Sequence, residues 1–396
     1  MRHSESPHPL ALLVPGLALI LLFFMMGCGS STSTTTTTPP PPIGTTNFVY
    51  TANAAGTPST VSALVSDPTS GMLSPISNSP YNTGSGSRAV KIDSAGKALF
   101  VANSASGDIS AFAINAGTGS LTEVPNSPFA AEAGIDAIAI DPGGTFLYAA
   151  SGSSGNLWEF SIDAAGALHN LASSPVLIDP AVTLSAVLVD PSGKYVYVAG
   201  GDSLSSRLYP FTRDSSSGEV TTIGGLPYPI DHSGNGITTD PGGKFVLVAS
   251  TGTSTLFGAI DVFSLDSTTG TLTAVANSPF HSGVDPSDIT VHPSGKFVYV
   301  ANTADATISL FTLDGTSGAL TEMANSPIPS GGNGTINGPT GIVADASGKY
   351  VYVCNASNDI SVFNVNSQTG ALTALANSPF ATGGNGPSGI ATVQKK

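Results

Sequence analysis

The chain has 396 residues, including 46 glycines and 29 prolines, and only 10% of its residues are charged. Its formal net charge of −14, with just 12 basic residues, argues against nucleic acid as a partner, because phosphate backbones attract basic surfaces. The length allows a substantial core, and the abundance of turn residues favours one repeat-built domain.

The N-terminus contains an apolar run from Leu10 to Met26, followed by Gly27 and Cys28. A small residue before a cysteine at the end of such a run resembles a bacterial lipoprotein signal, so residues 1–28 are predicted to be a lipoprotein-type signal peptide lipidated at Cys28. An ordinary cleaved export signal and an uncleaved single span stay open as alternatives, since the run is near the lower limit for crossing a bilayer. All three place the following domain outside the cytoplasm, and the leading prediction is an exported protein of the cell envelope with a lipid anchor in a bacterial membrane.

Residues 29–46 are predicted to be a Thr/Pro-rich linker, with STSTTTTTPPPP at positions 31–42. Such a segment buries nothing, and its proline run favours an extended polyproline II conformation. We expect it to be a stalk that holds the following domain away from a membrane.

Seven units with a period of roughly fifty residues follow between Phe48 and Val393, a length typical of propeller repeats. Each contains short runs that alternate apolar and polar residues, a second Asp or Asn turn that ends in Gly, and an Asn-Ser-Pro motif or a remnant of it. Every unit except the first also has an Asp-x-x-Gly-Lys type turn before its second strand. Proline lacks an amide donor, so this motif is expected at a sheet edge. The repeats align at Tyr50, Phe100, Tyr148, Tyr197, Leu247, Tyr299 and Tyr352.

This pattern predicts an all-β fold for residues 47–394, a seven-bladed β-propeller of four-stranded antiparallel blades. The first unit begins at its second strand, residues 47–53, and the chain finishes with an unmatched first strand, residues 389–393. We therefore expect the C-terminal strand to complete blade one, which leaves no unpaired inner edge.

Both turns of every unit fall on one face of such a ring, and the loops between strands two and three and the blade-to-blade crossovers fall on the other. The crossovers vary in length, and variable loops on a constant scaffold are where binding sites are usually built. Counting back five residues from each first turn gives one polar residue per blade at the channel-side start of strand one. These candidates are Arg88, Asp136, Ser185, Asn235, Ser287, Thr340 and Ser388.

Asp288 occupies the next position of its unit, where the other six have alanine or glycine, so it is a further candidate.

His232 and His281 lie in crossovers and are placed to approach the channel mouth or to be solvated loop residues, whereas His292 replaces a turn aspartate. The asparagines that end several second strands, Asn53, Asn103, Asn302 and Asn355, are expected to brace the adjoining loops. Cys354 stands where the other units have alanine, which indicates a small buried residue.

No metal site or cofactor is predicted. The histidines show no HExxH or paired CxxC spacing, and no nucleotide-binding or nucleophile-elbow motif stands in a convincing context. Carboxylates in the crossovers offer oxygen ligands to Ca²⁺, but no calcium loop accompanies them. They are Glu132, Asp136, Asp179, Asp231, Asp285 and Asp288.

The phrases His292-Pro-Ser-Gly-Lys-Phe-Val-Tyr-Val-Ala-Asn302 and Asp345-Ala-Ser-Gly-Lys-Tyr-Val-Tyr-Val-Cys-Asn355 resemble the seven-bladed lactonase propellers, the 6-phosphogluconolactonase group, and the related YVTN repeats of surface proteins. The resemblance covers all seven units and implies the same propeller fold. Of the Pro-Arg-His triplet characteristic of the lactonases, only Arg88 is matched, with Ser87 and Ala89 beside it. The best-matching turn has Pro286-Ser287-Asp288 instead, and Asn302 is followed by Thr303 rather than Glu.

Three functional hypotheses follow. The first is an exported, membrane-anchored propeller that binds a partner protein, a glycan or a small ligand on its crossover face, since the scaffold is intact and a convergent catalytic set is not apparent. The second is a lactonase-type hydrolase for an anionic sugar lactone, in which Arg88 holds the substrate and Asp288, Asp136 or His232 activates water. The third is a structural envelope protein.

Overall fold

The computed structural model describes residues 46–202, 205–225, 227–251, 257–333 and 338–395. The signal peptide predicted at residues 1–28, with Cys28, lies outside the described residues, as does the predicted linker up to residue 45. In the part of the chain that is described, no helix is long and apolar enough to cross a membrane.

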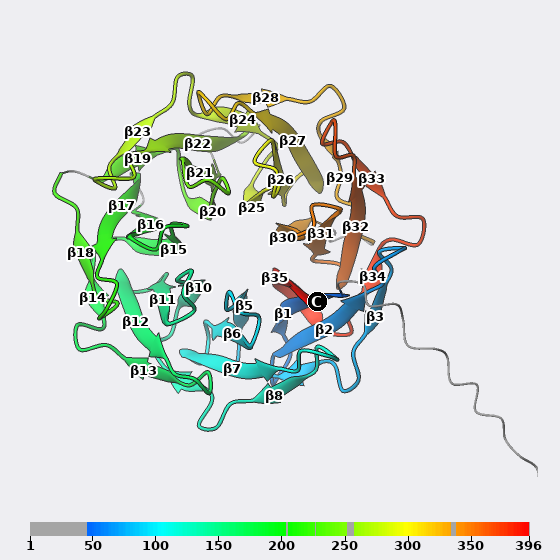
Figure 1. The fold of residues 1–396 in the computed structure, drawn as a ribbon, viewed down its shortest axis with the longest axis horizontal. Coiled ribbons are helices and arrows are strands. Elements are labelled where there is room, and N and C mark those ends of the chain that lie inside the picture. The colour runs from blue at the N-terminus through cyan, green and yellow to red at the C-terminus, as the bar shows by residue number, and fades with distance from the viewer. Residues whose placement is uncertain (1–45, 203–204, 226, 252–256, 334–337, 396) are drawn as a thin grey trace, which may run out of the picture. The chain divides into compact units, whose positions relative to one another are not determined.

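Seven antiparallel sheets surround a central channel as the blades of a propeller (Figure 1). In each blade the inner three strands follow one another outward from the channel, and the outermost strand is divided into two short pieces that both pair with the third strand. The predicted all-β, seven-bladed fold with four-stranded antiparallel blades is therefore confirmed.

The blades are built from the following strands, named outward from the channel. Blade 1 has β35 (Asn385–Lys395), β1 (Thr46–Ala55), β2 (Thr60–Ser66), β3 (Leu73–Pro75) and β4 (Tyr81–Asn82). Blade 2 has β5 (Ser87–Ile92), β6 (Ala98–Asn103), β7 (Asp108–Ile114), β8 (Leu121–Glu123) and β9 (Phe129–Ala130). Blade 3 has β10 (Ile135–Ile140), β11 (Phe146–Ser151), β12 (Asn156–Ile162), β13 (Leu168–Asn170) and β14 (Val176–Leu177). Blade 4 has β15 (Thr183–Val189), β16 (Tyr195–Gly201), β17 (Ser206–Arg213), β18 (Val220–Thr222) and β19 (Tyr228–Ile230).

The remaining blades repeat this order. Blade 5 has β20 (Gly234–Thr239), β21 (Phe245–Ser250), β22 (Gly258–Leu265), β23 (Leu272–Ala274) and β24 (Phe280–Ser282). Blade 6 has β25 (Pro286–Val291), β26 (Phe297–Asn302), β27 (Thr307–Leu313), β28 (Leu320–Glu322) and β29 (Ile328–Pro329). Blade 7 has β30 (Pro339–Ala344), β31 (Tyr350–Asn355), β32 (Asp359–Val365), β33 (Leu372–Ala374) and β34 (Phe380–Ala381).

The Asn-Ser-Pro motif makes the break in the outermost strand. In blade 2 the motif lies between β8 and β9, and the Ser127 hydroxyl accepts a hydrogen bond from the Ala111 amide of β7 at 3.0 Å. The serine thus satisfies a strand amide at the point where the outer strand leaves the ladder. The proline that follows lies at the sheet edge, as predicted, and equivalent serine–amide bonds occur in blades 1, 3, 5, 6 and 7.

The C-terminal strand closes the ring. β35 pairs with β1 in an antiparallel ladder that places Ile390 opposite Thr51 and Thr392 opposite Val49. It is longer than the predicted segment 389–393, because its pairing continues past a bulge to Asn385. Blade 1 is therefore completed by the end of the chain, as expected.

Neighbouring blades are joined by a tyrosine in strand two and a glycine in the second turn of the next blade. The Tyr50 hydroxyl donates to the carbonyl of Gly119 at 2.7 Å, and the same bond recurs in Tyr148–Gly218, Tyr197–Gly270 and Tyr299–Gly370. These glycines have positive φ, and a Cβ at Gly119 would collide with the Phe48 ring of the preceding blade. Glycine is therefore required here by backbone conformation and by close approach.

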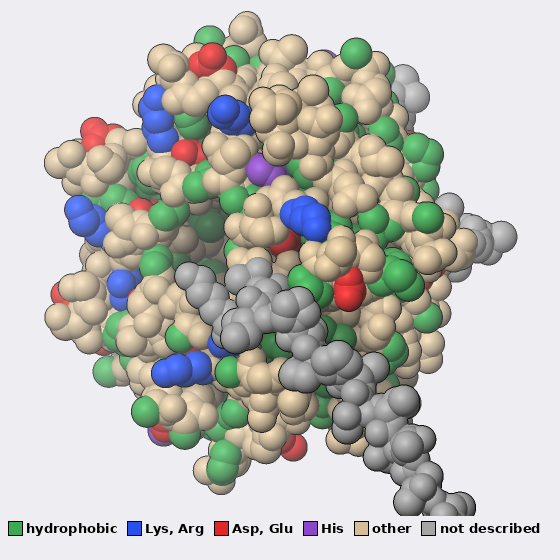
Figure 2. All heavy atoms as spheres, turned by 45° about the vertical axis from the view of Figure 1, so that its right-hand side comes forward, with side chains coloured by type: hydrophobic (Ala, Val, Ile, Leu, Met, Phe, Trp, Pro, Cys, Tyr) green, Lys and Arg blue, Asp and Glu red, His purple; other side chains and the backbone are tan. Residues whose placement is uncertain are grey.

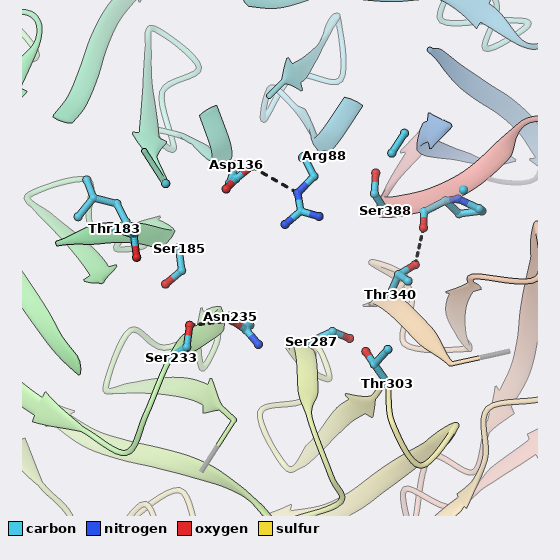
Figure 3. A pocket seen from close by; sticks show the side chains of 15 residues that line it. Arg88, Asp136, Thr183, Ser185, Ser233, Asn235, Ser287, Thr303, Thr340 and Ser388 are labelled. Carbon is cyan, nitrogen blue, oxygen red and sulfur yellow. Dashed lines mark hydrogen bonds and ion pairs between the residues drawn. The ribbon is translucent and has the colours of Figure 1, made fainter. Parts of the chain in front are cut away.

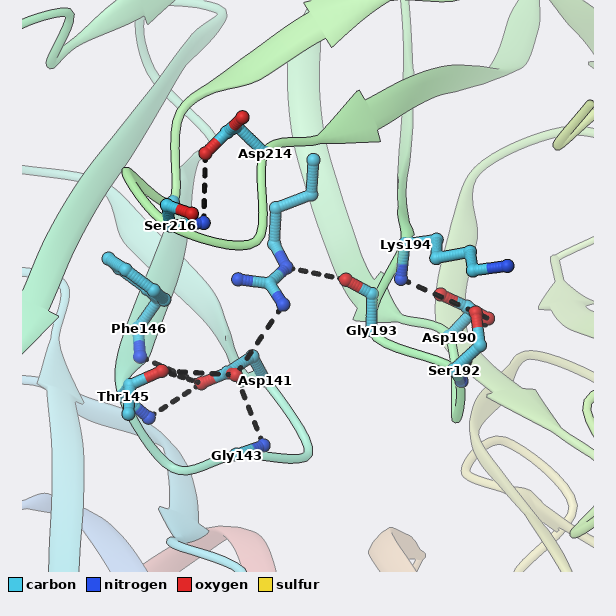
Figure 4. Close-up of polar contacts among 12 residues, drawn as sticks. Asp141, Gly143, Thr145, Phe146, Asp190, Ser192, Gly193, Lys194, Asp214 and Ser216 are labelled. Atoms are coloured by element: carbon cyan, nitrogen blue, oxygen red, sulfur yellow. Dashed lines mark hydrogen bonds and ion pairs between the residues drawn. The ribbon is translucent and has the colours of Figure 1, made fainter.

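The first turns carry further contacts between blades. Asp141 accepts bonds from the amides of its own turn, and Arg213 of blade 4 reaches it from a buried position, with Nη2 to Oδ2 at 3.7 Å (Figure 4). Arg213 also donates from Nε to the Gly193 carbonyl at 2.6 Å and lies over the Phe146 ring at 5.4 Å. This cation holds blades 3 and 4 together.

His292 performs the turn role predicted for it. Its Nδ1 accepts a bond from the Ser294 amide at 3.1 Å, as a turn aspartate would, and its Nε2 lies 2.8 Å from the Gly348 carbonyl of the next blade. The neutral tautomer protonated on Nε2 satisfies both contacts.

Two of the turn lysines also bind across a blade boundary. The Nζ of Lys244 donates to the Gly315 carbonyl at 2.7 Å, and that of Lys349 to the Pro68 carbonyl at 3.1 Å. Figure 2 shows the Lys and Arg side chains of this side of the molecule as separate points rather than one patch. Lys244 and Lys349 thus contribute contacts between blades.

Deleting residues 387–396 tests the closure, because it removes almost all of the ladder on β1 and exposes its row of unpaired backbone groups. We expect the midpoint of thermal unfolding, followed by circular dichroism, to fall by on the order of 10 °C or more. Deleting only residues 394–396 keeps the central pairs and serves as the control. Equal midpoints for the two truncated chains would contradict the role assigned to β35.

Candidate functional site

The crossover face contains a polar pocket of about 610 Å³ over the central channel. All seven residues found by counting back from the first turns line it, so the structure brings together Arg88, Asp136, Ser185, Asn235, Ser287, Thr340 and Ser388 (Figure 3). We call this space the inner pocket. Each of these residues lies at or near the start of the innermost strand of its blade, which is why one side chain per blade reaches the rim.

Five of the seven rim side chains form a belt of hydrogen bonds around the channel. Each donates to the backbone carbonyl of the residue just before the rim residue of the next blade. The bonds are Ser185 to Gly234 (2.7 Å), Asn235 to Pro286 (3.0 Å), Ser287 to Pro339 (3.0 Å), Thr340 to Pro387 (2.8 Å) and Ser388 to Ser87 (2.6 Å). The proton of each of the four hydroxyls is thus engaged in holding blades together, whereas its oxygen can still accept a hydrogen bond from a ligand.

Arg88 and Asp136 interrupt the belt. They form an ion pair, with Nε of Arg88 3.4 Å from Oδ1 of Asp136. The Arg88 side chain is 56% exposed to solvent and that of Asp136 is 28% exposed. Among the described residues that line the inner pocket they are the two that carry charge. A donor cation beside a carboxylate at the floor of a hydroxyl-rich pocket is an arrangement suited to polarising a carbonyl and accepting a proton.

The carboxylate of Asp288 is bonded to backbone amides, whereas a group that activates water is expected to face the ligand pocket. It lines a narrower cavity of about 120 Å³, and its carboxylate accepts bonds from the amides of Ile342 (3.0 Å) and Ile289 (2.9 Å). Burial raises its pKa, against the opposing effect of the Ile342 bond and the positive charge of Lys91. Asp288 therefore ties β25 to β30, satisfying an amide that faces the channel.

His232 does not join Arg88 and Asp136. It lines a separate pocket of about 560 Å³, which we call the outer pocket, beside Ser206 and Thr251. The backbone at His232 has a φ of 23°, so this residue turns away while the next one, Ser233, lines both pockets. Within the inner pocket, Arg88 therefore has Asp136 and not His232 beside it.

The asparagines that end strand two form buried polar clusters with strand three rather than with the adjoining loops. Asn103 donates to Asp108 (2.7 Å) and Ser110 (2.9 Å), and it accepts from Ser87 (2.9 Å). Asn302 and Asn355 make similar pairs of bonds, which supports a structural role.

In blade 5 the two strands exchange roles: the short hydroxyl side chain is on strand two and the longer polar side chain is on strand three. This feature was not predicted from the sequence. Ser250 takes the place of the asparagine and donates to the buried carboxylate of Asp261 at 2.7 Å, and the amide of Asp231 in the crossover also points to it, at 3.2 Å. The available signal was a carboxylate in the middle of strand three where neighbouring units have serine, as at Ser110 and Ser309.

The crossover carboxylates do not gather into a cation site. No group of three or more His, Cys, Asp or Glu side chains that could hold a metal ion occurs among the residues that the structure describes. Glu132, for example, accepts bonds from Ser154 and Asn156 and so organises its own crossover.

Comparison with protein families decides the relationship. The model described as "Lactonase, 7-bladed beta-propeller" matches residues 43–135, 124–230 and 231–392, which together span the whole ring. The chain belongs to this lactonase family. No curated protein matches it.

Solved structures similar to this lactonase-family propeller show the same fold at low identity. The putative 6-phosphogluconolactonase of Bacteroides fragilis has a TM-score of 0.70 and 19% identity, over 90% of this chain and 100% of its own. Its counterpart from Bacteroides uniformis has a TM-score of 0.71 and 20% identity, over 88% and 99%. The periplasmic gluconolactonase PpgL of Pseudomonas aeruginosa has a TM-score of 0.68 and 18% identity, again over 88% and 99%.

The buried carboxyl of Asp261 predicts a pH dependence of stability in this lactonase-family propeller. Burial raises its pKa from 3.8 to about 6, so the native state binds the proton more tightly than the unfolded chain does. The stabilisation is therefore fully present below the unfolded pKa and is lost as the pH rises through the folded one. From about pH 4 to about pH 7 the loss amounts to about 2–3 kcal/mol.

Urea unfolding of the wild type and of Asp261→Asn across that range measures the effect. The stability of the Asn variant relative to the wild type should increase with pH, mostly between about pH 4 and pH 6. Parallel stability curves would show that the carboxyl does not titrate in this way.

Proposed function

We propose that this propeller hydrolyses a sugar lactone in the inner pocket. Family membership and the pairing of Arg88 with Asp136, the two rim residues outside the belt of hydrogen bonds, support this proposal. From the sequence alone, binding of a partner or ligand is the first hypothesis and lactone hydrolysis the second, and membership of the lactonase family favours the second.

The chemistry assigns one role to each charged rim residue. Asp136 accepts a proton from a water molecule while the water oxygen forms a bond to the carbonyl carbon of the lactone. The guanidinium of Arg88 donates hydrogen bonds to the oxyanion that forms. When the intermediate collapses, the ring C–O bond breaks and the departing alkoxide takes up the proton, which yields an open-chain hydroxy acid. The hydroxyl oxygens of Ser185, Ser287, Thr340 and Ser388 accept hydrogen bonds from the hydroxyls of the sugar.

Substitution of the charged pair tests the proposal. In the purified full-length protein, Arg88→Gln should lower kcat for glucono-δ-lactone by roughly 10²-fold through loss of the oxyanion donor. Asp136→Asn should lower it by roughly 10²–10⁴-fold through loss of the base. Acid release is followed with a pH indicator, after subtraction of spontaneous hydrolysis.

Lys97→Gln is the matched control, because it removes an exposed cation from the turn at the other end of blade 2. It should leave kcat unchanged. Hydrolysis by the wild type at the spontaneous rate across a panel of lactones would end the enzymatic proposal, and so would full activity of both pocket variants.

We also propose that the protein is exported and anchored through a lipid on Cys28. Two observations support this proposal. The apolar run is followed by Gly27 and Cys28, and the name of one similar solved structure describes that protein as periplasmic. In a bacterial host fed radiolabelled palmitate, the wild type should be labelled and found with membranes, whereas Cys28→Ser should carry no label. Equal labelling of the two chains would rule out this anchor.

A further inference from the structure

The inner pocket adjoins the outer pocket. Thr183 and Ser233 line both, so the outer pocket lies next to the inner one at blades 4 and 5. Their volumes, about 610 and 560 Å³, each lie in the range of roughly 300–1,000 Å³ that encloses a drug-sized ligand. A monosaccharide lactone is far smaller than the two together.

The outer pocket presents an exposed imidazole. The Nδ1 atom of His232 lies 3.4 Å from Oδ1 of Asp231, and the backbone amide of Asp231 points to the buried carboxylate of Asp261. Nδ1 of the exposed ring thus faces Asp231, and Nε2 is the ring nitrogen that we assign to a ligand. Positive φ at a histidine costs energy, and such outliers recur at binding sites.

The lining of the outer pocket favours a neutral, hydroxyl-rich group. It includes Thr183, Ser206, Ser233 and Thr251 together with Asp202, and none of its described lining residues is Lys or Arg. Phosphate or carboxylate groups are usually bound by such cations. Sugar hydroxyls, which both donate and accept, match hydroxyls, a carboxylate and an imidazole.

We propose that the outer pocket is a subsite for a second sugar unit, so that the substrate is the lactone of a disaccharide or a longer glycan, with His232 as the contact that selects it. This inference rests on the proposed lactonase function and defines its substrate class. The reacting ring binds at Arg88 and Asp136, and the attached sugar extends past Thr183 and Ser233.

Kinetics of the full-length protein test the subsite with glucono-δ-lactone and with the δ-lactones of cellobionic and maltobionic acids. We expect KM for at least one disaccharide lactone to be about 5- to 10-fold lower than for glucono-δ-lactone, the effect of one or two added hydrogen bonds, with a similar kcat. His232→Gly should raise that KM to the level of the monosaccharide lactone. Glycine adopts positive φ at no cost, so the crossover keeps its path.

His281→Ala is the control, since this exposed histidine lies on β24 and packs against Phe257 without lining either pocket. It should change KM for neither class of substrate. Equal KM values for mono- and disaccharide lactones would overturn the subsite, as would an equal effect of His232→Gly on both, or a preference for 6-phosphogluconolactone over every disaccharide lactone.

Equilibrium binding separates this inference from the proposed reaction. Calorimetry with gluconate, cellobionate and maltobionate needs no turnover, so it reads the subsite even in a protein that hydrolyses nothing. Tighter binding of a disaccharide acid than of gluconate, lost in His232→Gly, supports the subsite. Equal affinities for all three acids overturn it, whatever the outcome of the lactone assays.

Discussion

The ring depends on the contact between an aromatic ring at the start of strand two and the glycine that ends the second turn of the next blade. At Gly119, Gly218, Gly270 and Gly370 a side chain would collide with that ring, and the glycine carbonyl accepts the hydroxyl of a tyrosine two residues further along the same strand. Buried tyrosine hydroxyls need such a partner. Each contact fixes the angle between two blades, and the repeated angle determines how the sheets surround one channel.

The channel and its rim follow from that geometry. Once the blades converge, the starts of the inner strands come close together, and a short polar side chain on one reaches the backbone of the next. Serine, threonine and asparagine make these bonds at five positions, whereas the longer Arg88 and the charged Asp136 meet each other instead. The two charged side chains of the inner pocket therefore lie at the two blades where the rim lacks the repeated hydrogen bond.

The blades, the closure of the ring and the residues of the pocket rim could be predicted from the sequence. They follow from the repeat length and from the order of the strands along the chain. Counting back from the first turns identified six rim residues, because these blades have the same distance from turn to channel, and the equivalent position of the C-terminal strand is Ser388. The contacts of Asp288 with Ile342 and of Asp261 with the Asp231 amide could not be predicted, because they join segments from different strands and loops whose spacing a period does not contain. Which of the two pockets His232 lines also depends on the local path of its crossover, where the backbone has a positive φ that a period does not contain.

The closing ladder has a mechanical consequence. The chain enters the ring at Thr46 through β1, which is hydrogen-bonded to β2 on one side and to β35 on the other. A pull on the preceding segment acts along β1 and loads both ladders in shear, so many bonds resist together instead of opening one at a time. Force applied at Thr46 is therefore taken up by a strand that is paired on both sides.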